Sequence, residues 1–315
     1  MPLHGTLLNK RITIYLFLLT LIGSAHAAVA GGDMRSCTFL PPSSWKRLTF
    51  DGSGTSAKIT TRIQLTSTAE MPGDLITTGE GKALDGVEMA ENTTLLTVET
   101  TVHYLLFFNA TYTEHILFNT ANARVYRRIR QRHGTDPWVK AYYWTRQGVQ
   151  RRKIMPASPD EKKQAPVKWT RQSQSLFPYP DERECLVISD STMLCYLLSV
   201  LEYRKLPSVL CVFGKARFHR LIIDEQASFP IKTAFKMHSS SGDDRVEAQL
   251  TPLVFSVSAL PAVSPAIKPE PFSLLGLEKD ICIYIDPSRR LPIRVSGVNP
   301  KLGNLILNLS DAELK

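Results

Sequence analysis

The chain has 315 residues, a formal net charge of +9 at pH 7 and 43% hydrophobic residues. A chain of this length and apolar content can bury a large core, which excludes an intrinsically disordered protein. The excess of cations favours an anionic partner without naming its chemical class.

The first 27 residues have the pattern of a secretory signal peptide. Lys10 and Arg11 precede the uncharged apolar run 12–22, and Ala25 and Ala27 provide small residues at the cleavage spacing. The apolar run is about half of the roughly 20 residues that a membrane-spanning helix needs. We therefore expect cleavage after Ala27, an exported protein, and no transmembrane segment in the mature chain.

Apolar and polar residues alternate through the first half of the mature chain, which predicts β-strands. The long stretch 94–108 would span about 50 Å as one strand, so we expect it to curve as strands of barrels and half-barrels do. Its apolar face carries Val98, Val102, Tyr104 and Leu106. The other strands of this part are expected at 57–66, 112–119, 124–132, 139–145 and 149–154.

A change of composition follows at 155–182, where prolines and charges predict a long surface loop. Residues 189–192 then offer N-capping side chains before an apolar segment, which predicts a helix with Leu194 and Leu198 in its apolar stripe. Two interpretations of this helix stay open: a core helix packed on a sheet, or a plug that closes the mouth of a barrel.

The C-terminal part again predicts strands, with a second proline-rich loop at 260–271. The fold class is therefore mainly β: a curved antiparallel sheet forming a half-barrel or barrel, with one buried or lid helix. Residues 28–315 are expected to form a single domain. The strands of this part are expected at 209–213, 218–224, 246–257, 281–285, 291–296 and 304–309.

Five cysteines remain after the signal peptide, and an exported chain meets an oxidising compartment. At most two intramolecular disulfides can form, so one thiol is left over. The spacing matches no zinc motif, and the pairing is not deducible from the sequence. The five residues are Cys37, Cys185, Cys195, Cys211 and Cys282.

The stretch 281–309 resembles the end of an exported bacterial family catalogued as domain of unknown function 3108. The resemblance rests on an apolar strand, Asp286-Pro287, the segment 291–295 and a last alternating strand. More loosely, 123–154 and the helix after Ser189-Asp190 fit the middle of that family. The resemblance implies a periplasmic antiparallel β-fold similar to lipoprotein-carrier half-barrels, in which a curved sheet wraps an apolar cavity. It implies no catalytic residues.

The sequence offers no catalytic or metal-binding motif. It has neither a nucleophile elbow nor a glycine-rich phosphate loop, and no histidines have the spacing of H-E-x-x-H. His103 and His115 lie on expected strands and could meet in space, although ordinary strand histidines are the simpler interpretation. We therefore predict no cofactor and no metal, and we expect no binding of nucleic acid because the chain is exported.

Basic residues are concentrated in 124–153, which holds ten Lys or Arg and one acid, whereas 70–91 carries an excess of acids. Antiparallel pairing would gather the basic side chains on one face of the sheet, beside Tyr142 and Trp144. Such a face is either solvated or a binding surface for polyanions, since arginine suits phosphate through its bidentate geometry. The candidate anion- or membrane-binding residues are Arg124, Arg128, Arg130, Arg132, Arg151 and Arg152.

Three functions follow as hypotheses. The first is a non-catalytic periplasmic protein that binds a lipid or other hydrophobic ligand in a cavity lined by Val98, Val102, Tyr104, Leu106, Leu194 and Leu198. The second is an envelope protein that docks on an anionic membrane, or on an acidic protein of the envelope, through the basic face. The third is an envelope hydrolase.

Overall fold

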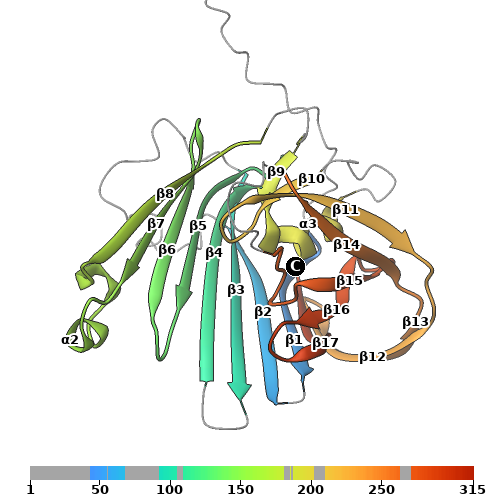
Figure 1. Ribbon diagram of the computed structural model, residues 1–315. Helices are drawn as coiled ribbons and strands as arrows, with labels where there is room; N and C mark the ends of the chain where they lie inside the picture. Colours follow the sequence, from blue (N-terminus) through green and yellow to red (C-terminus); the bar gives the residue numbers. More distant parts are fainter. Residues whose placement is uncertain are drawn as a thin grey trace, which may run out of the picture. The chain divides into compact units, whose positions relative to one another are not determined.

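A computed structural model describes residues 43–54, 56–67, 92–104, 109–180, 185, 187–201, 210–262 and 271–315. Seventeen strands within these ranges join in one large curved sheet (Figure 1). The described chain is mainly β and has one helix of seven residues, which confirms the predicted class.

The first eight strands pair antiparallel with their neighbours in chain order, and Figure 1 shows β8 at the far edge of this series. Most of the connections are short, as expected of a meander. These strands are β1 (Trp45–Ser53), β2 (Ala57–Ser67), β3 (Thr93–Tyr104), β4 (Asn109–Asn119), β5 (Val125–Arg132), β6 (Trp138–Trp144), β7 (Gly148–Met155) and β8 (Arg171–Pro178).

The remaining strands continue the sheet from β1 through β17, β16, β15, β14, β11 and β10 to β9. The hairpin of β12 and β13 attaches to β17 by a short parallel ladder at 236–238 and 311–313. The bounds are β9 (Val187–Asp190), β10 (Leu210–Phe213), β11 (Phe218–Gln226), β12 (Ile231–Ser239), β13 (Gly242–Leu250), β14 (Leu253–Pro261), β15 (Lys279–Asp286), β16 (Leu291–Asn299) and β17 (Gly303–Leu314).

Period-two alternation explains why these segments form strands with one buried face. In β2, Ile59, Ile63 and Leu65 are buried, whereas Lys58 and Arg62 between them are exposed. Successive side chains of a strand point to opposite faces, so this sequence fits a sheet with one apolar face on a core.

The predicted helix is α3 (Leu194–Val200), which follows a 3-10 turn, η3 (Ser191–Met193). The carboxylate of Asp190 caps η3 by accepting a hydrogen bond from the backbone N–H of Thr192. Every residue of α3 is buried, and its Tyr196 ring packs edge-on against Trp45 of β1 and Phe118 of β4. The helix is therefore part of the core, as the first of the two interpretations has it.

The loop expected over 155–182 is only partly a loop. It holds α2 (Pro159–Lys162), a 3-10 turn η2 (Pro166–Lys168) and all of β8, which pairs with β7 along its whole length. The prediction of a loop throughout was wrong because the polar segment 171–177 lacks apolar alternation, and pairing with β7 alone makes it a strand.

Several predictions lie outside the described residues. These are the signal peptide at 1–27, Cys37, the acidic excess over 70–91, Leu106 and most of the loop expected at 260–271. Among the helices that the structure describes, none has the length and apolar character needed to cross a membrane.

Candidate functional site

A row of charged side chains crosses four adjacent strands on one face of the sheet. The register places Glu114 of β4 opposite Arg130 of β5, Arg130 opposite Lys140 of β6, and Lys140 opposite Lys153 of β7. Arg128 lies on the same face of β5 and reaches β9 and β10, so we call this face the inner face. We call Arg130, Lys140 and Lys153 the cationic row.

Directly opposed like charges on adjacent strands destabilise a sheet. In the cationic row this occurs twice in succession, at Arg130–Lys140 and at Lys140–Lys153. Glu114 compensates Arg130, so Lys140–Lys153 is the opposed pair at which an added negative charge would reduce the repulsion.

Aromatic rings lie beside several of these cations. The Lys140 Nζ is 4.5 Å from the centre of the Trp138 ring, and the Arg130 guanidinium is 5.9 Å from the same ring. Arg132, at the end of β5, lies 6.0 Å from the ring of Tyr112. Cation–π contacts of this kind hold the cations in place while leaving their N–H groups able to donate.

Glu114 is the acid that faces the cationic row, and it is bound at one end of it. The Arg130 Nε lies 2.8 Å from the Glu114 Oε1, and the Thr192 hydroxyl donates to the other carboxylate oxygen at 3.0 Å. Burial alone would raise the pKa of Glu114, but Arg130 and Arg128 hold this pKa below its ordinary value. Glu114 is therefore charged at neutral pH. Its charge compensates Arg130, the nearest member of the cationic row, and Lys153 lies at the other end of that row.

Burial by itself lowers the pKa of Arg130, but the Glu114 carboxylate, with Tyr142 and Asp190, raises it above its ordinary value. Only 17% of the Arg130 side chain is exposed. We therefore assign Arg130 a positioning role in the row, and the prediction that it contacts a membrane directly does not agree with its burial.

Arg128 is a core residue and not a surface cation. Its side chain is 1% exposed, and its guanidinium donates to the Asp190 Oδ2 at 2.5 Å and to the Gly214 carbonyl at 2.6 Å. The ring of Tyr142 lies 4.1 Å from the guanidinium carbon. The prediction that Arg128 binds anions on the surface is wrong, because the tertiary fold covers this position with β9 and β10.

Asp190 is the counterion that makes this burial tolerable. Burial and the nearby Glu114 carboxylate raise the pKa of Asp190, and Arg128 lowers it. The net result is a pKa above the ordinary aspartate value. Removing one partner of such a buried ion pair lowers the free energy of unfolding by more than the pair itself contributes, because the remaining charge is buried away from water. The pair therefore ties β5 to β9 and β10 and fixes where the inner face ends.

The other predicted arginines do not lie on one face. Arg151 is on the inner face, where it donates to the Ser175 hydroxyl and lies 5.0 Å from the Phe177 ring. Arg152, the next residue, is on the opposite face and donates to Gln172. Arg124 is exposed before the start of β5. The prediction of a single basic face is corrected in this respect, because adjacent residues of a strand alternate sides.

The residues predicted to line a ligand cavity belong to the core. Val98, Val102, Leu194 and Leu198 lie in one buried apolar cluster, and Tyr104 packs against it. A hollow elsewhere, on the surface, is lined by both polar and apolar residues of β1, β2 and β17, among them Ile59 and Ile306. Binding of a hydrophobic ligand among these residues stays a prediction.

The two strand histidines do not meet. His103 lies opposite Asn109, whereas His115 lies opposite Thr97, so they occupy distant levels of the β3–β4 ladder. Within the described ranges, no cluster of three His, Cys, Asp or Glu side chains has the arrangement of a metal site.

A disulfide joins Cys185, two residues before β9, to Cys211 in β10. Cys195 and Cys282 are free thiols, and burial raises the pKa of the Cys195 thiol to about 12. One bridge and two free thiols among the described cysteines agree with the expected limit of two bridges.

The sequence placed Lys140 and Lys153 in the basic stretch 124–153 without marking them as site residues, and it did not identify Glu114 or Asp190 as partners of the arginines. The short turn between β4 and β5 predicts the hairpin, but a register shift at Leu117–Phe118 moves the pairing by one residue and sets Glu114 opposite Arg130. Asp190 gives no comparable signal, since it meets Arg128 across 62 residues of chain.

Comparison with protein-family models, with curated proteins and with solved structures gives no match for this chain. The resemblance to the exported bacterial family stays a prediction.

Proposed function

We propose that this protein is a non-catalytic binding protein of the cell envelope, which holds an anionic lipid by its phosphate group over the cationic row. The single observation that carries the proposal is the register that sets Arg130, Lys140 and Lys153 opposite one another on three adjacent strands.

The ligand's charge follows from the residues of the inner face. Arg132 and Arg151 flank the cationic row, and Glu114 is already bound to Arg130. Lysine ammonium and arginine guanidinium groups both bind phosphate oxygens, and guanidinium does so with two parallel hydrogen bonds. Each basic residue near an anionic lipid surface contributes about 1 kcal/mol of attraction.

A lipid head group is favoured over a hydrophobic ligand enclosed in the core. The apolar residues that would line an internal cavity are buried in the core cluster around α3, whereas the cationic row lies on the part of the inner face beyond Arg128. The periplasm is the compartment we propose. The leader pattern at 1–27 and the Cys185–Cys211 disulfide both support export to an oxidising compartment.

The test uses vesicles of phosphatidylcholine with and without phosphatidylglycerol, and measures co-sedimentation of the protein. We expect binding only to the vesicles that contain phosphatidylglycerol. The double variant Lys140→Gln/Lys153→Gln should weaken this binding at least tenfold, because it removes two of the three opposed cations without adding charge.

The matched control is Lys162→Gln/Lys163→Gln at the C-terminal end of α2, which removes the same charge outside the strands of the sheet. Equal losses in both variants would contradict the proposal and indicate attraction by net charge alone. A competition arm with glycerol phosphate separates the two sources of phosphate: displacement at millimolar concentration would mean that a free phosphate ester is the ligand.

A further inference from the structure

The edge strand β8 is largely exposed, and its Phe177 packs against Phe213 on the inner face. Six of its eight residues are exposed, the other two are half-buried, and Leu176 is 51% exposed. Every residue from Arg171 to Pro178 pairs with β7 on one side, and no ladder joins the other side to any strand among the described residues. The outer side therefore presents a row of backbone donors and acceptors to solvent.

Natural edge strands usually carry features that block further pairing, such as lysines, prolines or bulges. In β8 the register with β7 is unbroken, Arg171 is the one charged residue, and Pro178 stands at the last position. The six residues 172–177 between them have neither a charge nor a proline. This edge thus lacks the usual protection against an added strand.

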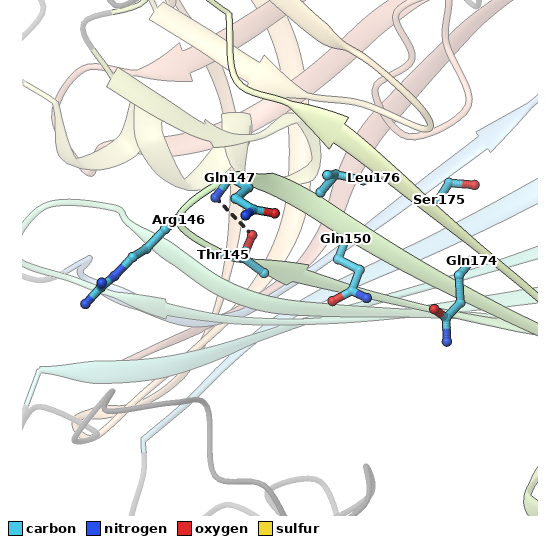
Figure 2. Close-up of a pocket in the computed structure, with 7 residues that line it drawn as sticks. All are labelled: Thr145, Arg146, Gln147, Gln150, Gln174, Ser175 and Leu176. Carbon is cyan, nitrogen blue, oxygen red and sulfur yellow. Dashed lines mark hydrogen bonds between the residues drawn. The ribbon is translucent and has the colours of Figure 1, made fainter.

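A hollow of about 490 Å3 lies beside this edge (Figure 2). Figure 2 shows Gln174 and Leu176 of β8 together with Gln150 of β7 and the turn after β6. Gln150 lies opposite Leu176 in the ladder, and Gln174 is two residues from Leu176 on the same strand, so all three share the outer face. An added strand places alternate side chains on this face, next to the hollow.

The charges at this edge select the partner. Strands β6, β7 and β8 contain five Lys or Arg and no Asp or Glu, and Arg146 adds a further cation at the rim of the hollow. A second copy of this chain would bring the same charges together, whereas an acidic segment would neutralise them.

We propose that the outer edge of β8 binds an extended acidic segment of another protein as an additional strand. Backbone hydrogen bonds would supply much of the affinity. Acidic side chains on the outer face would meet the glutamine amides of the hollow, and Arg146 in the turn after β6 would add positive charge nearby. The backbone edge of β8 is separate from the cationic row, but the positive charge that selects an acidic occupant includes Lys140 and Lys153 of that row. The charge variant below therefore uses residues outside the row.

The test measures amide hydrogen exchange of 171–178 in the full mature protein, with synthetic octapeptides as probes. One peptide alternates threonine and glutamate, and the other alternates threonine and lysine. We expect the acidic peptide to slow exchange of the β8 amides at least tenfold and the basic peptide to leave it unchanged. Absence of slowing with the acidic peptide, or equal slowing with both peptides, would overturn the proposal.

A charge variant tests the chosen partner. Arg146→Glu/Arg171→Glu should weaken binding of the acidic peptide at least tenfold, measured by fluorescence anisotropy. The matched control Lys162→Glu/Lys168→Glu reverses the same charge on α2 and η2, and it should retain the affinity within about twofold, because exposed pairs interact weakly at a distance. Equal losses in the two variants, or exchange that slows with protein concentration without peptide, would overturn the choice of an acidic partner.

Discussion

In β2, every second side chain is buried against the core, whereas in β8 no side chain is buried. Both strands are antiparallel and fully paired with a neighbour. The strands around α3 are stabilised by burial in one large apolar cluster. In contrast, β8 adds the half-buried Phe177 to a smaller cluster around Tyr142 and Phe213 and depends mainly on backbone pairing with β7. One continuous sheet thus changes along its width from strands packed on a core to an exposed edge strand, and the buried Arg128 of β5 lies between these two regions.

The largest expected effect is at that boundary. Arg128→Met leaves the Asp190 carboxylate buried without its cation, and we expect it to lower the free energy of unfolding by about 3–5 kcal/mol. Urea unfolding measures this loss. Because burial favours the protonated form of an unpaired Asp190, the loss should shrink as the pH falls.

Two comparisons sharpen this prediction. Arg132→Met, on the same strand and face, should change stability by about 0.5 kcal/mol or less, as surface substitutions do. Adding Asp190→Asn to Arg128→Met removes the unpaired charge and keeps an acceptor for the Thr192 N–H, so it should recover part of the loss. A double variant no more stable than Arg128→Met would contradict the role assigned to the buried charge.

Leucine truncations compare the two regions directly. Leu198→Ala in α3 should cost about 2–5 kcal/mol, because it removes a fully buried side chain from the core. Leu176→Ala in β8 should change stability by about 0.5 kcal/mol or less, since its side chain is half exposed. Similar losses at the two positions, measured by thermal unfolding, would show that the β8 edge is covered in solution.

The smallest expected effect concerns the hairpin of β12 and β13. His238 lies 2.8 Å from Asp243 and 3.0 Å from Asp311 of β17, and hydrogen bonds to these carboxylates raise its pKa above the ordinary value. The stabilisation is complete below the unfolded-state pKa of histidine and is lost as the pH rises through the raised folded-state pKa. His238→Gln should therefore lower the urea midpoint at pH 6 more than at pH 9. An equal shift of the urea midpoint at pH 6 and pH 9 would mean that the charge of His238 does not contribute to stability.

The sequence by itself determined the fold class and most strand positions, because period-two alternation records which side of a strand faces the core. The segments expected at 57–66 and 281–285 correspond to β2 and β15, and the expected helix is α3. Capping by Asp190 was also visible, since it depends on residues two positions apart.

Which arginines are buried and which are exposed depends on how the sheet closes in three dimensions. Alternation places Arg128, Arg130 and Arg132 on one face of β5. It does not predict that β9 and β10 cover Arg128, whereas Arg132 stays partly exposed. The partner of Arg128 is 62 residues away, and a contact over that distance depends on how the whole sheet closes. Likewise β8 has no apolar period of its own, so its strand conformation and its open edge follow from pairing with β7.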